Sequence, residues 1–225
     1  MSRCVLVTGV ARGIGAAIAK RLVADGWLVH GVDVDDADLT TREGNRAVVE
    51  AALERFDGRL DALVANAGFQ HVSPVRDFPE EQWDKLQALL VTSPFLLAKY
   101  AWDALAASGD GRFLVVASVH GLVASPFKAG YVAAKHGVLG LVKVLALEGA
   151  EAGISASAIC PGYVRTAIVE AQLEDRPLDD LLAPQAVKRL LEPSEVAAAA
   201  AWLLGPDGRA VTGAPLVMDL GWTAR

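Results

Sequence analysis

Short apolar runs rich in β-branched residues alternate with longer segments of helical periodicity, and this alternation restricts the fold more than any other feature. The apolar runs predict strands at Cys4–Thr8, Trp27–Val34, Leu60–Ala65, Arg112–Ser118, Ile154–Ile159 and Ala214–Met218. The segments between them predict helices at Ile14–Ala24, Arg46–Phe56, Glu80–Ala107, Tyr131–Glu151 and Ser194–Leu204. Continuous apolar strands between helices are typical of a parallel sheet covered on both faces, and right-handed crossovers make it doubly wound. We therefore expect an α/β fold with a doubly wound parallel sheet, helices on both faces, and a single domain over residues 1–225.

The segment 166–193 departs from this alternation, because it carries many charges and prolines with little periodicity. It follows a strand end, which is where open α/β sheets bind ligands. We interpret it as a mobile lid over a site, with an ordinary surface connection as the alternative.

Composition limits the possible partners. The net charge is −6 and the basic residues are scattered, which argues against a nucleic acid or an anionic membrane. The longest apolar run, Val196–Leu204, is much shorter than the ~20 residues that cross a bilayer. Cys4 and Cys160 lie in apolar runs, which favours buried, reduced thiols over a reactive role. We expect a cytoplasmic protein, because the N-terminus lacks a secretory leader pattern, and we predict no metal site.

A glycine-rich loop, TGVARGIG at residues 8–15, joins the first predicted strand to the first helix. Gly9, Gly13 and Gly15 let the backbone turn sharply and approach a pyrophosphate closely. The helix that begins at Ile14 offers free N–H groups and a positive dipole end to such an anion. The order strand, glycine loop and helix therefore predicts a dinucleotide site.

Two further strand ends belong to the same site. Asp33 ends the second strand, where a carboxylate can accept hydrogen bonds from ribose hydroxyls and would repel a 2′-phosphate. This favours NAD over NADP, although Arg12 in the glycine loop could pair with a phosphate. Asn66, Ala67 and Gly68 end the next strand, and their small size lets a cofactor lie close.

The reacting groups are predicted from a helix start. Tyr131 and Lys135 are four residues apart and share one helix face. A neighbouring ammonium favours the phenolate, which can accept the proton of a secondary alcohol while hydride leaves for the cofactor. Ser118 ends the preceding strand and could orient the substrate oxygen.

Together, these motifs and Pro161-Gly162 resemble the short-chain dehydrogenase/reductase superfamily over nearly the whole chain. The resemblance implies a Rossmann-type fold. It also implies that Lys135 holds the nicotinamide ribose and that Asp38 and Leu39 contact adenine. Further cofactor contacts implied by the resemblance are Pro161, Gly162, Val164 and Thr166.

One subfamily is closer still. The stretches NAGFQHV at 66–72, SVHG at 118–121, YVAAKH at 131–136 and ICPGYV at 159–164 are similar to 3-hydroxybutyrate dehydrogenases. In that subfamily, polar side chains hold the carboxylate of a small hydroxy acid. The matching positions here are Gln70, His120, Lys128 and Gln172. His120 follows Ser118 by two residues, so both would face one side if the strand continued that far.

Two departures from the family pattern stand out. Where the resemblance implies an asparagine whose helix break frees a carbonyl for a proton-relay water, this chain has Leu90. Either the relay is lost, or Pro94, which has no N–H, frees the Leu90 carbonyl and preserves the water site. Secondly, the interval between Asp33 and Asp61 has room for only one helix, with the third strand reduced to about Ala37–Leu39.

Three functions follow from the sequence. The first is NAD-dependent oxidation of a small 3-hydroxy acid such as 3-hydroxybutyrate. The second is a dehydrogenase or reductase for another alcohol or ketone, such as a 3-oxoacyl thioester or a steroid. The third is a nucleotide-binding protein without turnover, which Leu90 motivates and the intact Ser118, Tyr131 and Lys135 argue against. The resemblance also implies a homotetramer built on Glu80–Ala107, Tyr131–Glu151 and the last strand.

Overall fold

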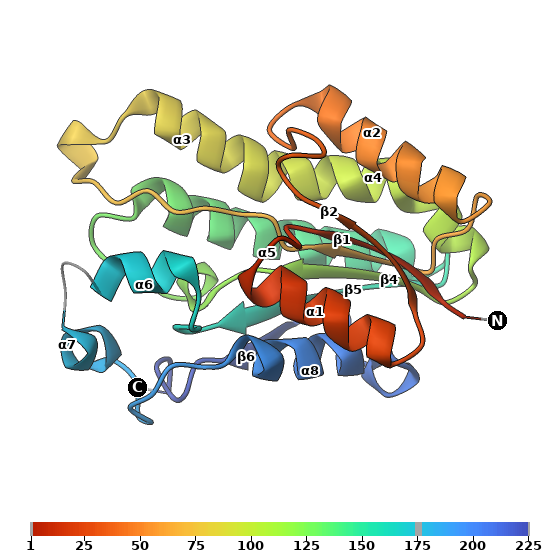
Figure 1. Ribbon diagram of the computed structural model, residues 1–225. Helices are drawn as coiled ribbons and strands as arrows, with labels where there is room; N and C mark the ends of the chain where they lie inside the picture. Colours follow the sequence, from red (N-terminus) through yellow and green to blue (C-terminus); the bar gives the residue numbers. More distant parts are fainter. Residues whose placement is uncertain (1, 174–176, 225) are drawn as a thin grey trace.

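The computed structural model describes residues 2–173 and 177–224 and is organised around one parallel sheet with the strand order β2-β1-β3-β4-β5-β6 (Figure 1). The strands are β1 (Cys4–Thr8), β2 (Leu28–Val32), β3 (Ala62–Ala65), β4 (Gly111–Val116), β5 (Ile154–Pro161) and β6 (Pro215–Met218). The helices are α1 (Gly13–Ala24), α2 (Arg42–Arg55), α3 (Glu80–Gln87), α4 (Ser93–Ala107), α5 (Ala129–Gly149), α6 (Ala167–Leu173), α7 (Leu178–Leu182) and α8 (Pro193–Leu204). The doubly wound α/β fold is therefore confirmed.

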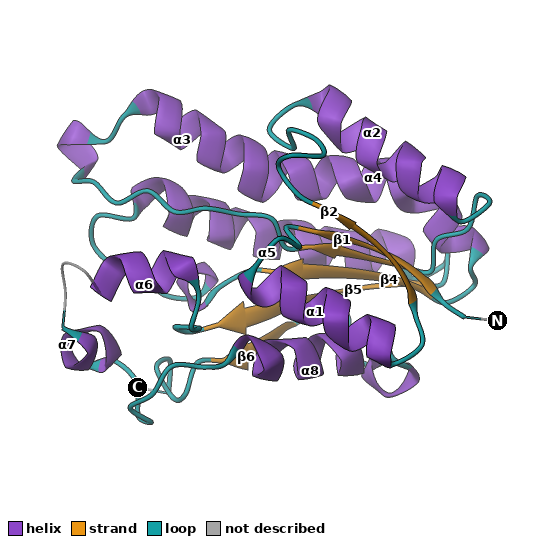
Figure 2. Cartoon of the chain, viewed as in Figure 1, coloured by secondary structure: helices purple, strands orange, loops and turns teal. Residues whose placement is uncertain are grey.

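Alternating side chains along the strands divide the core into two layers. Leu63 and Phe113 face one side of the sheet, where α2, α4 and α5 pack against them. Val64 and Leu114 face the other side, which α1 and α8 cover. Figure 2 shows the strands between these two helical layers. Burial on both faces explains why the strands are continuous apolar runs.

Helix α5 is also long and apolar enough, by length and composition, to cross a membrane, and it is the one such helix within the described residues. It packs on β5 in the core and carries Tyr131 and Lys135, so we assign it as a core helix.

The predicted third strand at Ala37–Leu39 does not form, and β2 is the edge of the sheet. Instead, the side chain of Asn45 in α2 donates hydrogen bonds to the carbonyls of Leu39, at 2.8 Å, and Thr41, at 2.6 Å. The Leu39 carbonyl therefore has a helix partner and does not pair in a sheet. Between β2 and β3 the chain forms a turn and the single helix α2.

The predicted continuous helix Glu80–Ala107 is interrupted by a π-helical turn at Ala88–Thr92. There the Ser93 N–H donates to the Ala88 carbonyl, five residues earlier. Pro94 follows directly and has no N–H to continue a regular ladder. The helix is thus irregular around Leu90, as the Pro94 hypothesis requires, whereas the water at the Leu90 carbonyl stays a prediction.

Two other segments differ from their predictions. The strand Arg112–Ser118 ends at Val116, and Ser118 instead caps a 3₁₀ turn, Val119–Gly121. The segment 166–193, predicted to lack periodicity, contains the short helices α6 and α7, and residues 174–176 lie outside the described residues. The role of this segment as a lid stays a prediction.

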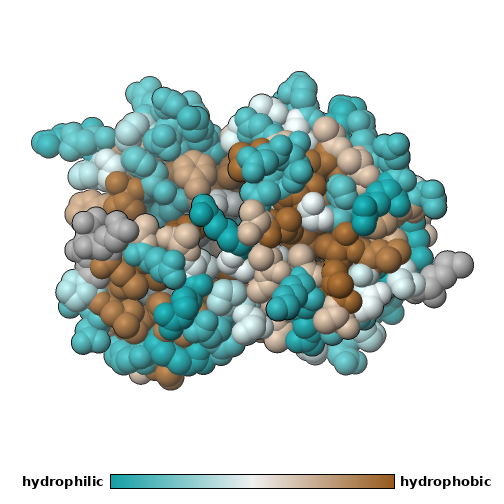
Figure 3. Space-filling view, in the orientation of Figure 1, coloured by the Kyte–Doolittle hydropathy of each residue, from teal (hydrophilic) through white to brown (hydrophobic). Residues whose placement is uncertain are grey.

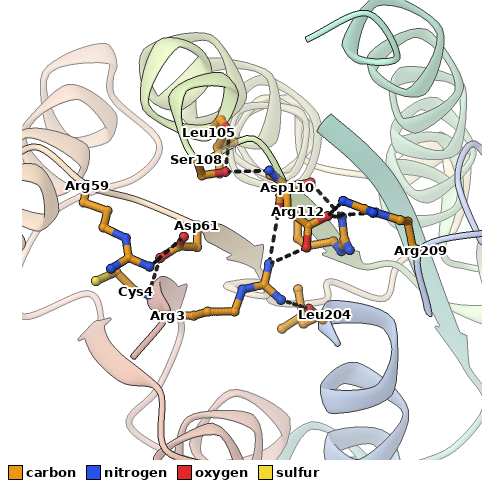
Figure 4. A network of polar contacts seen from close by, with 11 residues as sticks. Arg3, Cys4, Arg59, Asp61, Leu105, Ser108, Asp110, Arg112, Leu204 and Arg209 are labelled. Atoms are coloured by element: carbon orange, nitrogen blue, oxygen red, sulfur yellow. Dashed lines mark hydrogen bonds and ion pairs between the residues drawn. The ribbon is translucent and has the colours of Figure 1, made fainter. Parts of the chain in front are cut away.

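A network of arginine and aspartate side chains lies at the amino ends of the strands, at the opposite end of the sheet from their carboxyl ends (Figure 4). The Asp110 carboxylate accepts from Arg112 at 2.7 Å and from Arg209 at 2.9 Å, and Arg3 lies 3.7 Å away. Only 3% of the Arg112 side chain is exposed, and its Nε and Nη2 have no hydrogen-bond partner. The Asp110 charge is therefore what compensates a buried guanidinium.

We expect Asp110→Asn to lower the free energy of unfolding by about 3 kcal/mol, because it leaves a buried cation uncompensated. Urea denaturation measures this change. The control is Asp25→Asn, which breaks the exposed Arg21–Asp25 pair and should cost about 0.5 kcal/mol. Equal losses in the two variants would contradict the role given to Asp110.

Candidate active site

The carboxyl ends of the parallel strands surround one cavity of about 530 Å³. Helix α6 borders the cavity on one side, and α1 with the β2–α2 connection borders it on the other. The surface in Figure 3 is hollowed at this place. All but one of the predicted site residues line it: Gly9, Arg12, Gly13, Ile14, Asp33, Asp38, Leu39, Asn66, Ala67, Gly68, Gln70, Ser118, His120, Lys128, Tyr131, Lys135, Pro161, Gly162, Val164, Thr166 and Gln172. The exception, Gly15, lies beneath the loop.

The first turn of α1 packs directly on the end of β1. A Cβ added to Gly15 would lie 2.0 Å from the Gly9 carbonyl oxygen and 2.4 Å from Asn66 Nδ2. The Asn66 amide donates to the carbonyls of Thr8, at 2.9 Å, and Gly9, at 3.1 Å. The Thr8 hydroxyl in turn accepts from the Asn66 and Ala67 N–H groups. This holds the N-terminus of α1 against the cavity, where its free N–H groups suit a pyrophosphate.

Asp33 and Asp38 shape the adenosine side. The Asp33 carboxylate accepts hydrogen bonds from the N–H groups of Ala11, at 2.7 Å, and Val34, at 2.8 Å. Hydrogen bonds from Thr40 lower the pKa of the Asp38 carboxyl. Both side chains are acceptors placed where ribose hydroxyls could donate to them.

Tyr131 and Lys135 meet in the buried part of the cavity. Lys135 Nζ lies 5.5 Å from the centre of the Tyr131 ring and donates to the Val116 carbonyl at 2.8 Å. Burial lowers the pKa of Lys135 to about 8 and raises the pKa of Tyr131 to about 12, while a hydrogen bond with Ser118 lowers the Tyr131 value. Ser118, Tyr131 and Lys135, the three predicted catalytic residues, are therefore brought together.

His120 lies beside Ser118, but not because the strand continues. The 3₁₀ turn brings the His120 N–H to the Ser118 hydroxyl oxygen at 3.1 Å. Both ring nitrogens have partners, since Nδ1 is 3.4 Å from Ser118 Oγ and Nε2 is 2.9 Å from Ser125 Oγ. Burial, together with nearby Lys128, lowers the pKa of His120 to about 3, so the ring is neutral.

Lys128 brings a positive charge to the same end of the cavity. It is the residue before α5, only 7% exposed, and its Nζ donates to Gln172 Oε1 at 3.4 Å. The ammonium also lies 5.7 Å from the centre of the Tyr163 ring. Gln172 comes from α6, so the segment 166–193 contributes to this wall. The arrangement can hold a small anion beside Tyr131.

Leu90 lies in a buried apolar cluster that packs against Tyr131. It is 2% exposed and clusters with Leu86 and Ala134, with Tyr131 packed against the group. Its Cδ2 lies so close to Gly68 that a Cβ there would approach to 2.9 Å. The leucine thus fills the position where the family resemblance implies an amide.

Sequence reasoning did not single out two aromatic residues. The rings of Tyr163 and Trp222 lie 5.0 Å apart, and Trp222 also packs against His120 at 5.4 Å. Tyr163 lies within the stretch ICPGYV, which could have indicated it. Trp222 follows the last strand, where no pattern marks it as part of a site.

The glycine loop at a helix N-terminus and the tyrosine–lysine pair define a nucleotide-dependent oxidoreductase on a Rossmann-type sheet. Residues 29–223 match the family model described as enoyl-(acyl carrier protein) reductase. The chain is 37% identical to a D-beta-hydroxybutyrate dehydrogenase of Rhizobium meliloti, covering 100% of both chains. It is 39% identical to another of that name from Cupriavidus necator, covering 98% of this chain and 97% of the relative.

A solved structure titled "Crystal structure of gox2181" superimposes with a TM-score of 0.94 at 27% identity, covering 100% of this chain and 96% of that one. The chain belongs to the short-chain dehydrogenase/reductase family, and it is an oxidoreductase acting on a hydroxyl or keto group. The alignment with the Rhizobium relative extends over 259 residues, more than the 225 of this chain, so that relative has segments that this chain lacks.

We expect Gly15→Ala to abolish detectable nucleotide binding, because the new methyl group would collide with the Gly9 carbonyl. Titration of the protein with the reduced cofactor, followed by fluorescence, measures binding. The matched control is Gly140→Ala on the exposed side of α5, where nothing lies within 4 Å of an added Cβ. Nucleotide binding by folded Gly15→Ala that equals the control would show that the close contact is dispensable.

The lowered pKa of Lys135 predicts a pH dependence of stability. Between pH ~8 and ~10.5 the unfolded chain binds more protons at this lysine than the folded one, so its contribution to the free energy of unfolding rises with pH. Lys135→Met removes that contribution. The free energy of unfolding of the variant minus that of the wild type should therefore fall as the pH rises from ~8 to ~10.5. Chemical denaturation of both proteins measures the difference, and a constant difference would contradict the prediction. Tyr131 and Cys160 also have shifted pKa values, both raised. Because both residues are present in the two proteins, their effects on the pH dependence largely cancel in the difference.

Proposed function

We propose that the protein oxidises the hydroxyl group of a small 3-hydroxy acid, such as 3-hydroxybutyrate, with NAD, and catalyses the reverse reduction. The observation that carries this proposal is the position of Lys128. Its ammonium lies in the cavity wall three residues before Tyr131 and contacts Gln172. A carboxylate a few atoms from the reacting hydroxyl suits this cation. The two hydroxybutyrate dehydrogenases that the chain resembles support the same class of substrate.

The residues of the chain then have distinct tasks. Ser118 orients the substrate hydroxyl, and the Tyr131 phenolate accepts its proton. The Lys135 ammonium favours the phenolate, since a nearby positive charge opposes the effect of burial on the tyrosine. NAD, when bound, supplies the acceptor for the hydride.

The choice of NAD rests on the charge around the adenosine side. Asp33 and Asp38 line that part of the cavity, and their carboxylates would repel a 2′-phosphate. Arg12 lines it as well and is the residue that could favour NADP.

A second candidate is reduction of a 3-oxoacyl thioester. Two relatives favour it by name, an acetoacetyl-CoA reductase of Rhizobium meliloti that is 35% identical and a 3-oxoacyl-[acyl-carrier-protein] reductase of Vibrio cholerae that is 32% identical. The buried position of Lys128 favours the small acid instead, because a thioester has no carboxylate at that place.

We also propose a homotetramer in the cytoplasm. Exposed apolar side chains support the assembly, with Leu147 of α5 80% exposed, Phe95 of α4 45% and Val217 of β6 40%. The free, buried thiols of Cys4 and Cys160 support a reducing compartment.

Lys128→Met tests the substrate. We expect the KM for one enantiomer of 3-hydroxybutyrate to rise at least about tenfold, from loss of a charge-assisted contact, with kcat changed little. NADH formation from both enantiomers, from neutral alcohols and from a 3-hydroxyacyl thioester is measured, with NADP in place of NAD as the cofactor control. Lys143→Met, which removes an exposed lysine of α5, the helix that follows Lys128, should behave as wild type. Turnover of neutral alcohols or the thioester alone would overturn the small-acid proposal, and nucleotide binding without any turnover would overturn the enzyme.

A further inference from the structure

A continuous chain of hydrogen bonds leads from the Tyr131 phenol toward the surface. Ser118 hydrogen-bonds Tyr131, and Ser118 Oγ lies 3.4 Å from His120 Nδ1. On the other side of the ring, His120 Nε2 lies 2.9 Å from Ser125 Oγ. Ser125 is half-buried and precedes the exposed Pro126, so the chain of contacts ends at the protein surface.

Oxidation of an alcohol requires such a route, because it leaves one proton on Tyr131 in each turnover. Leu90 presents only an apolar side chain to this tyrosine, so no side-chain atom at position 90 can receive the proton. The Lys135 ammonium donates to the buried carbonyl of Val116. On the side of Tyr131 where Ser118 lies, polar groups are present, and they lead through His120 to Ser125.

We propose that Ser118, His120 and Ser125 form a proton wire between Tyr131 and solvent. It rests on the alcohol oxidation proposed above but not on which alcohol is the substrate. The Tyr131 phenolate accepts the proton of the substrate hydroxyl, and NAD, when bound, would take up the hydride from the substrate carbon. Tyr131 then passes a proton to Ser118, whose own proton goes to His120 Nδ1.

The ring releases its Nε2 proton to Ser125, and the Ser125 proton goes to water. The reaction therefore yields ketone, NADH and one proton. Rotation of the hydroxyls and exchange between the neutral tautomers of His120 reset the wire, and reduction uses it in the opposite direction.

The surroundings of His120 suit this task. The ring packs edge-on against Tyr131, at 6.0 Å, and Trp222, at 5.4 Å, which fixes both nitrogens relative to the two serines. Lys128 and His136 are the charged or titratable groups that act on it, and both disfavour its cationic form. A neutral imidazole can accept at one nitrogen while it donates at the other. With Nε2 bound to Ser125, His120 serves as a relay, and Lys128 and Gln172 hold the substrate anion.

Ser125→Ala is the sharpest test, because Ser125 lies outside the described residues that line the cavity. We expect kcat to fall at least about tenfold, with the KM for the alcohol nearly unchanged. The solvent deuterium isotope effect on kcat should rise, and the effect of deuterium at the substrate carbon should fall toward unity, since proton transfer becomes slow. Ser125→Thr keeps a hydroxyl and should retain most of the wild-type kcat.

Wild-type kcat and unchanged isotope effects in Ser125→Ala would overturn the wire. So would a raised KM with unaltered isotope effects, which indicates a structural role alone. Each assay uses the best substrate found for the wild-type enzyme, so rejection of the 3-hydroxy acid leaves the test intact. If the wild-type enzyme turned over none of the substrates, that result would overturn the proposed function and the wire with it.

Discussion

The contact between Gly15 and the Gly9 carbonyl determines the geometry of the whole site. The first turn of α1 can lie against the end of β1 only because residue 15 has no side chain. The Asn66 amide then bonds to the same segment, which links β1 to β3 at the point where both strands end. A helix N-terminus, two strand ends and a small-residue floor therefore meet at one place, and this is where an anionic nucleotide is best stabilised.

Burial is the second constraint, and it acts in opposite directions on the two reacting groups. The same apolar surroundings raise the pKa of Tyr131 and lower that of Lys135, so each group alone is driven toward its neutral form. A phenolate beside an ammonium becomes favourable when the two charges form together in a low-dielectric site. The bonds with Ser118 and the Val116 carbonyl then determine where the proton and the positive charge lie.

Much of this arrangement could be predicted because it depends on local patterns. Buried parallel strands appear as apolar runs, and β1 was predicted at its observed bounds. Other features depend on contacts that no local pattern shows. The Ala37–Leu39 strand fails because Asn45, in the following helix, takes the Leu39 carbonyl. The place of Trp222, for example, depends on how the C-terminal segment folds back over His120.

The two departures of this chain from its family have a common physical logic. At position 90, an amide would lie in an apolar cluster against Gly68 and would need hydrogen-bond partners that Leu86 and Ala134 do not offer. Leucine fills that space without an unsatisfied polar group, which favours stability over polarity on this side of Tyr131. Between β2 and β3, the loss of a strand is compensated by Asn45, which bonds to the freed backbone and accepts the Ser93 hydroxyl at 2.6 Å. That hydroxyl lies at the start of α4, directly after the π turn, so the remodelled edge of the sheet and the remodelled helix support one another.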